Sequence, residues 1–142
     1  MNIDGYNCPD NLYYHKEHMW LRVEGDLCVV GFNDFGQKLA GQIKRIISLE
    51  EEDEVEADKP FGTISTGKWS GKLFSPVSGE IAYYNEELDN EPSYVNNDPY
   101  GKGWIIKVRP TNAQAEVARL MKTSDPTFAD WMRGQIVKYA KK

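Results

Sequence analysis

The chain has 142 residues, of which 40% are hydrophobic and 27% are charged, and its formal net charge is −5. This length provides one hydrophobic core of ordinary size, and the composition is typical of a soluble globular domain. The acidic balance excludes a nucleic-acid-binding surface, which needs clustered Lys and Arg, and no apolar run approaches the length of a membrane span. The first residues lack the basic start and apolar stretch of a signal peptide, so a cytoplasmic location is expected.

Two cysteines, Cys8 and Cys28, are too few for a disulfide framework, and their spacing fits no metal motif. Cys28 lies in the apolar run 27–30 and is expected to be a small residue within a strand. Cys8 lies in a polar segment and is a candidate exposed thiol.

The first two thirds of the chain predict short strands separated by turns. Residues 12–32 alternate between apolar and polar side chains around Glu24-Gly25-Asp26, which is typical of a hairpin. Asn33 is the expected N-cap of a short helix that runs to Ala40 and ends at Gly41. Further strands are expected at 43–47, 61–65, 73–75, 80–85 and 104–109. This pattern predicts a mainly β protein, a sandwich or barrel, rather than βαβ units.

After Pro110 the pattern becomes helical. Residues 113–121 predict one helix, and Ser124 or Asp125 is expected to cap another, with Pro126 in its first turn. An apolar stripe at helical spacing follows and predicts a face packed on the domain, with docking of a partner as the alternative; the stripe is Phe128, Trp131, Met132, Ile136, Tyr139 and Ala140. We therefore expect a single domain over 1–142, with a β core at about 12–110 and a helical extension at about 111–142.

Neither metal binding nor catalysis is indicated. The acidic run 50–58 lacks the alternating oxygen ligands and the glycine of a calcium loop, so a solvated turn is expected. His15 and His18 are three residues apart, and on an extended strand they would point to opposite faces. No nucleophile elbow, phosphate loop or zinc-protease motif occurs, which favours a carrier or binding module over an enzyme.

Lys68 is the most informative residue. It lies in the run 65–81, next to Gly67 and shortly before Ser75-Pro76. Glycine permits the positive φ of a tight turn, and flanking strands would hold such a turn rigid. A lysine presented in this way is suited to covalent attachment of a prosthetic arm. The alternative is an ordinary solvated lysine on a turn.

Six segments together resemble the lipoyl carrier H protein of the glycine cleavage system, over about residues 12–122; they are 18–26, 31–35, 41–43, 53–56, 73–80 and 95–107. The Asn-Asp-Pro-Tyr-Gly-x-Gly-Trp run at 97–104 is especially typical of that family. The resemblance implies a flattened, lipoyl-domain-like β-barrel or sandwich and a non-catalytic carrier. It places lipoic acid in amide linkage on Lys68, not Lys72, because the family's modified lysine lies eight residues before the Ser-Pro proline. Gly67, Trp69 and Gly71 would then support the turn or dock partners.

The modification site also departs from the family pattern. The usual Glu-Ser-Val-Lys-Ala is replaced by Ser65-Thr66-Gly67-Lys68-Trp69. The usual His-Glu-Trp is replaced by His18-Met19-Trp20, and the C-terminal helix from Pro126 extends beyond the usual end of an H protein. These changes resemble the lipoate-binding proteins of the heterodisulfide-reductase-like sulfur-oxidation system. The favoured hypothesis is therefore a carrier of sulfur-bound intermediates and electrons, with that enzyme complex and a lipoate ligase as partners.

The alternative is a glycine cleavage H protein, which would carry the aminomethyl group of glycine among glycine decarboxylase, aminomethyltransferase and dihydrolipoyl dehydrogenase. In either case the arm supplies a strained cyclic disulfide that opens readily to thiolate attack. A biotinyl carrier is disfavoured, because its modified lysine would lie between methionines rather than between Gly67 and Trp69. A module that has lost its arm is the remaining alternative.

Overall fold

The computed structural model describes residues 1–140, so Lys141 and Lys142, the end of the expected helical extension, lie outside the described residues. The strands are β1 (Asn2–Ile3), β2 (Tyr6–Asn7), β3 (Tyr13–His15), β4 (Met19–Glu24), β5 (Leu27–Phe32), β6 (Arg45–Ser48), β7 (Glu54–Val55), β8 (Pro60–Ser65), β9 (Ser70–Phe74), β10 (Gly79–Tyr84) and β11 (Ile106–Pro110). The helical segments are α1 (Asp34–Ala40), η1 (Glu86–Asp89), α2 (Tyr94–Asn97), α3 (Ala113–Val117), α4 (Phe128–Gln135) and η2 (Ile136–Ala140).

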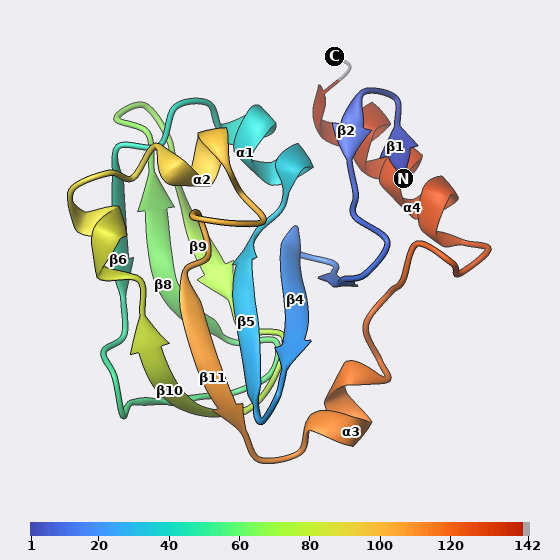
Figure 1. Cartoon of the computed structure of the whole chain (residues 1–142). Coiled ribbons are helices and arrows are strands. Elements are labelled where there is room, and N and C mark those ends of the chain that lie inside the picture. Colours follow the sequence, from blue (N-terminus) through green and yellow to red (C-terminus); the bar gives the residue numbers. More distant parts are fainter. Residues whose placement is uncertain (141–142) are drawn as a thin grey trace.

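The main body is a sandwich of two antiparallel sheets (Figure 1). One sheet has the order β3-β4-β5-β11-β10-β7, and the other has the order β6-β8-β9. Their facing sides form one buried apolar cluster that includes Leu21 and Val108 from the first sheet and Ile64 and Leu73 from the second. The prediction of a mainly β sandwich is confirmed.

In the first half of the chain, the hairpin and the short helix predicted from turn and capping residues are present in the structure. The β4–β5 hairpin turns at Gly25-Asp26, and the positive φ of Gly25, 60°, fits a tight turn. Asn33 caps α1, because its side chain accepts a hydrogen bond from the Gly36 N–H at 2.7 Å, and Gly41 ends the helix. Cys28 lies buried within β5, as expected.

Several strand boundaries differ from the sequence prediction. The strand expected at 43–47 is β6, which begins at Arg45, because the Ile43 N–H binds the Asn96 side chain at 2.8 Å instead of a neighbouring strand. The strand expected at 73–75 is β9, which begins at Ser70 and ends at Phe74, since Ser75 turns the chain with its hydroxyl on the Val77 carbonyl. The short strands β1, β2 and β7 were not predicted.

A second apolar cluster joins both ends of the chain to the outer side of the larger sheet (Figure 1). Phe128, Met132 and Ile136 are buried in it and Trp131 is half-buried, which confirms the predicted packing face as far as Ile136. Tyr139 and Ala140, the end of the predicted stripe, are exposed. The helix itself begins at Phe128, two residues beyond Pro126, because Asp125 turns back to accept a hydrogen bond from the Lys122 N–H.

The expectation of an exposed Cys8 thiol is wrong. Cys8 is buried in the same cluster, and burial raises its pKa to about 11.

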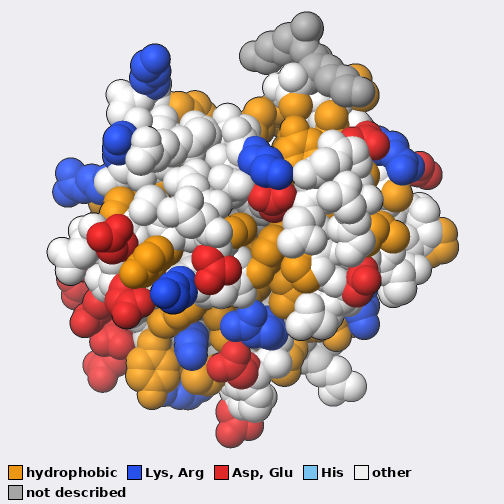
Figure 2. Space-filling model, turned by 45° about the horizontal axis from the view of Figure 1, so that its top comes forward, with side chains coloured by type: hydrophobic (Ala, Val, Ile, Leu, Met, Phe, Trp, Pro, Cys, Tyr) orange, Lys and Arg blue, Asp and Glu red, His pale blue; other side chains and the backbone are white. Residues whose placement is uncertain are grey.

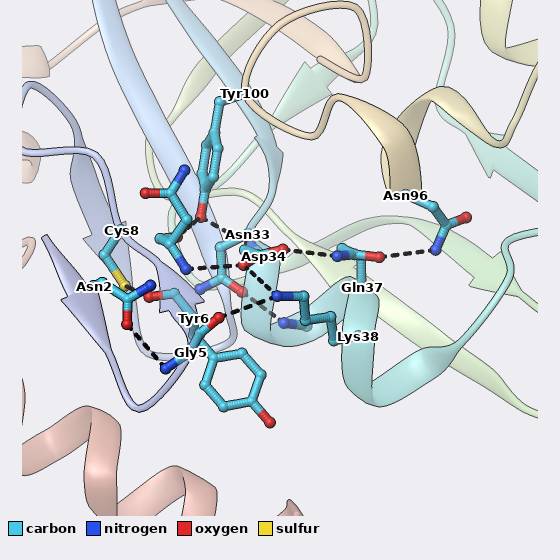
Figure 3. Close-up of polar contacts among 12 residues, drawn as sticks. Asn2, Gly5, Tyr6, Cys8, Asn33, Asp34, Gln37, Lys38, Asn96 and Tyr100 are labelled. Carbon is cyan, nitrogen blue, oxygen red and sulfur yellow. Dashed lines mark hydrogen bonds and ion pairs between the residues drawn. The ribbon is translucent and has the colours of Figure 1, made fainter.

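A polar network around α1 links the N-terminal segment to the loops beside the sandwich (Figure 3). The buried Asp34 carboxylate accepts hydrogen bonds from the Asn7 N–H and the Gln37 amide, at 2.8 and 2.7 Å. The Asn96 amide then donates to Gln37 at 3.0 Å and to the Gly41 carbonyl at 2.8 Å. The segment that leads into β6 is thereby fixed to α1 and α2.

None of the helices in residues 1–140 combines the length and the apolar character that crossing a bilayer requires.

Candidate functional site

Lys68 lies at the tip of the β8–β9 hairpin. The paired strands end at Ser65 and Ser70, and the Thr66 N–H donates to the Trp69 carbonyl at 2.9 Å to close the loop. Gly67 has a φ of 94°, a value that glycine adopts readily at a tight turn. The Thr66 hydroxyl accepts a further bond from the Trp69 N–H at 3.3 Å. No role was predicted for Thr66 from the sequence, although threonine beside a Gly-containing turn is a recognisable signal.

The Lys68 side chain is exposed, and within residues 1–140 its ammonium group makes no ion pair or hydrogen bond. The space around the turn is also open, since a Cβ placed on Gly67 would meet no atom of the described residues, 1–140, within 4 Å. An amine in these surroundings can be acylated without breaking any internal contact. Lys72 is exposed too, but it lies within β9 opposite Thr63, away from the tip. The hairpin therefore fits an attached acyl arm at Lys68 better than at Lys72.

Trp69 packs on its own hairpin. Its indole lies across Gly71 so closely that a Cβ at position 71 would be 2.4 Å from the ring. Even so, 46% of the Trp69 side chain remains exposed. The structure thus brings Gly67, Lys68, Trp69 and Gly71 together on one turn, and it leaves one face of the indole accessible beside the lysine.

The base of the hairpin is held by the sandwich. Phe61, Ile64 and Leu73 are buried between the sheets and anchor both strands. Next to the tip, the Lys44 N–H donates to the Ser65 carbonyl at 2.9 Å, so the segment fixed by Asn96 also braces the end of β8. Asn96 lies in the family-like run 95–107, and no separate role was predicted for it from the sequence.

The two histidines lie in different surroundings. His15 ends β3, and its Nε2 is 2.6 Å from the Asp58 carboxylate, a hydrogen bond that lowers the pKa of Asp58. His18 lies in the turn before β4 rather than on a strand, with a φ of 67°, and packs among aromatic rings. Within residues 1–140, no group of three or more His, Cys, Asp or Glu side chains is arranged to hold a metal ion.

Comparison with known proteins shows the family to which this chain is related. Residues 12–128 match the family described as "Glycine cleavage H-protein". The chain belongs to this family. It is 44% identical over 119 residues to the glycine cleavage system H protein of Halalkalibacterium halodurans, covering 84% of this chain and 92% of that protein. It is 42% identical over 121 residues to the probable glycine cleavage system H protein 2 of Sulfolobus acidocaldarius, covering 81% and 80%.

The fold agrees. The crystal structure of a glycine cleavage system H protein from Mycobacterium marinum superimposes with a TM-score of 0.77 and 25% sequence identity, over 90% of this chain and 98% of that one. Members of the family are non-catalytic carriers with lipoic acid attached covalently to a lysine.

The expectation of a sulfur-oxidation carrier is wrong. Proteins that are 41–45% identical over 77–84% of this chain, from Halalkalibacterium halodurans, Bacteroides thetaiotaomicron and Carboxydothermus hydrogenoformans, are named glycine cleavage system H protein. That expectation depended largely on the residues around Lys68. In the structure, those residues lie on one exposed turn, and the chain as a whole has the fold of the solved H protein.

Proposed function

We propose that this chain is the lipoyl carrier of a glycine cleavage system, with the lipoyl arm in amide linkage to Nζ of Lys68. A lipoate ligase would attach the arm. Glycine decarboxylase, aminomethyltransferase and dihydrolipoyl dehydrogenase would then act on it in turn. The observation that carries the proposal is the exposed lysine at the tip of the β8–β9 hairpin, in a chain that belongs to the H-protein family.

In this proposal, the protein positions the lipoyl arm for the partner enzymes. Acylation converts the Lys68 ammonium into a neutral amide, and no ion pair is lost within residues 1–140. The hairpin fixes the root of the arm, and the tether makes transfer at a docked partner a local event at an effective concentration in the millimolar range. The arm, when attached, supplies a disulfide that can accept the one-carbon group and return as a dithiol. Buried Ile64 and Leu73 keep this root from shifting.

The test uses the full chain. It is lipoylated with a purified ligase, and its intact mass is expected to rise by one lipoyl group. The lipoylated protein is then offered glycine and glycine decarboxylase, which should release carbon dioxide and add one aminomethyl group to the carrier. A lipoylated chain that glycine decarboxylase cannot use would refute the proposal.

We further propose that Trp69 is a docking residue, held in place by Gly71. Gly71→Val should push the indole away, because the added Cβ would overlap the ring, and Trp69→Ala should remove it. Both variants should still be lipoylated and should raise the KM of glycine decarboxylase for the carrier by about tenfold, with kcat nearly unchanged. Thr63→Val, on the exposed outer face of the same hairpin, is the matched control. An unchanged KM in both variants would limit Trp69 to packing on its own hairpin.

A further inference from the structure

A groove runs along the outer edge of β6, between this strand and the segment that contains η1. Its volume is about 610 Å3, and it is lined by 44–51 together with Tyr84, Glu86, Leu88 and Asp89. It lies on the side of the molecule formed by β6, β10 and η1 (left in Figure 1). Nothing in the proposed carrier chemistry uses it.

The strand beside the groove has one open edge. β6 pairs with β8, and its other edge has no strand partner among residues 1–140. The Leu49 N–H points toward β8, where it donates to the Phe61 carbonyl at 2.9 Å. Neighbouring residues of a strand direct their backbone groups to opposite edges, so the N–H groups of Ile46 and Ser48 face the groove. Such an edge is a template for one more strand.

The side chains of the groove divide it into three parts. Ile47 and Leu49 are exposed by 52% and 41% and give it an apolar middle. Lys44 and Arg45 lie at the end beside the Lys68 hairpin. Glu50 and Glu51 follow β6 at the other end, and Glu86 and Asp89 line the groove from η1, which packs beside the strand. Acidic side chains lie beside hydrophobic ones on this side of the molecule (Figure 2).

We propose that this groove binds an extended segment of a partner enzyme, which adds to β6 as an extra strand. The segment would carry an apolar residue for Ile47 and Leu49, an acidic end for Lys44 and Arg45, and a basic end for the carboxylates. The inference rests on the proposed carrier function. It also explains how a partner would be aligned, because the groove begins where the Lys44 N–H binds Ser65, three residues before Lys68.

A second copy of the chain fits the groove less well. β6 has four residues, so pairing with itself would give only a few hydrogen bonds and would bury far less than the ~1,600 Å2 of a stable interface. A partner enzyme would contact both the groove and the hairpin tip. Contacts of modest strength also suit a carrier that must leave each enzyme after transfer.

The experiment compares lipoylated full-length variants in glycine decarboxylation. One variant inverts the charge gradient without changing the net charge, by Lys44→Glu, Arg45→Glu, Glu50→Lys and Glu51→Lys. None of these four side chains forms an ion pair within residues 1–140. A second variant, Ser48→Pro, removes an N–H that faces the groove and keeps the bonds to β8. Exchanging the exposed ion pair of Glu80 and Arg109, on the other sheet, is the matched control.

Both groove variants should raise the KM for the carrier by about tenfold with kcat nearly unchanged, and the control should match the wild type. An unchanged KM in both groove variants would overturn the inference while leaving the carrier function intact. A wild type that sediments as a dimer, and becomes a monomer on charge inversion, would assign the groove to a second copy and also overturn it. Failure of the lipoylated wild type itself to react would instead count against the carrier function on which the inference rests.

Discussion

Lys68→Arg should abolish lipoylation and, with it, all carrier activity. Arginine keeps the positive charge and the length of the side chain, but its guanidinium group cannot be acylated by a ligase that modifies an amine. The Lys68 side chain is exposed and makes no bond within residues 1–140, so the fold should not respond. The melting temperature should stay within about 2 °C of the wild type, which is the range for a surface substitution that removes no contact.

Lys72→Arg is the matched control, four residues along the same hairpin. It should gain one lipoyl group, as the wild type does, and should react with glycine decarboxylase at the wild-type rate. Intact-mass measurement of both variants after incubation with ligase checks the prediction. A lipoyl group found on the Lys68→Arg chain would place the modification elsewhere.

The elements predicted correctly from the sequence are those whose signals are local. Asn33 and Gly41 mark the two ends of α1, and the turn at Gly25-Asp26 marks the β4–β5 hairpin, because each depends on a few neighbouring residues. Gly67 likewise identifies the tip that carries Lys68. Such signals need no knowledge of distant parts of the chain.

The features that were missed depend on distant contacts. Cys8 is buried because the N-terminal segment packs beside α4, more than a hundred residues away, and no local pattern records this. The Ile43 N–H binds Asn96, so a strand-like run begins pairing only at Arg45. The groove along β6 likewise becomes visible only once η1 is placed beside that strand.

The predicted role in sulfur oxidation was wrong because it depended on a few local residues. The substitutions around Lys68 received more weight than the similarity of the remaining chain, although a two-residue turn at the surface can change without altering the fold beneath it. Trp69 illustrates this, since its indole packs on Gly71 and leaves the buried residues Ile64 and Leu73 in place. These substitutions lie on the turn where we propose that partner enzymes bind.

His18 should make the folded protein sensitive to mild acid. Its ring packs against Phe35, Trp131 and Tyr139, and its Nδ1 atom has no hydrogen-bond partner within residues 1–140. Burial in these surroundings disfavours the charged imidazolium, and the nearby His15 acts in the same direction. Together they lower the pKa of His18 from 6.5 to about 4.

Acid lowers the stability of the folded chain because His18 binds a proton more readily in the unfolded chain. Above pH 6.5, His18 is neutral in both the folded and the unfolded chain, and stability is at its full value. As the pH falls from 6.5 toward 4, the unfolded chain takes up the proton first, so the free energy of unfolding decreases, by up to roughly 3 kcal/mol. The lowered pKa values of Asp10 and Asp58 act only below their ordinary 3.8, outside this window.

His18→Asn should remove most of this pH dependence. Asparagine tolerates the positive φ at position 18 and cannot be protonated in this range, although it loses aromatic packing and lowers stability at neutral pH. Urea unfolding at several pH values between about 7 and 4.5 measures the slope. Glu17→Gln, at the exposed neighbouring position in the same turn, should keep the wild-type slope. An equally steep loss of stability in His18→Asn would show that another group binds the proton, and that the aromatic surroundings of His18 do not set the acid limit of the fold.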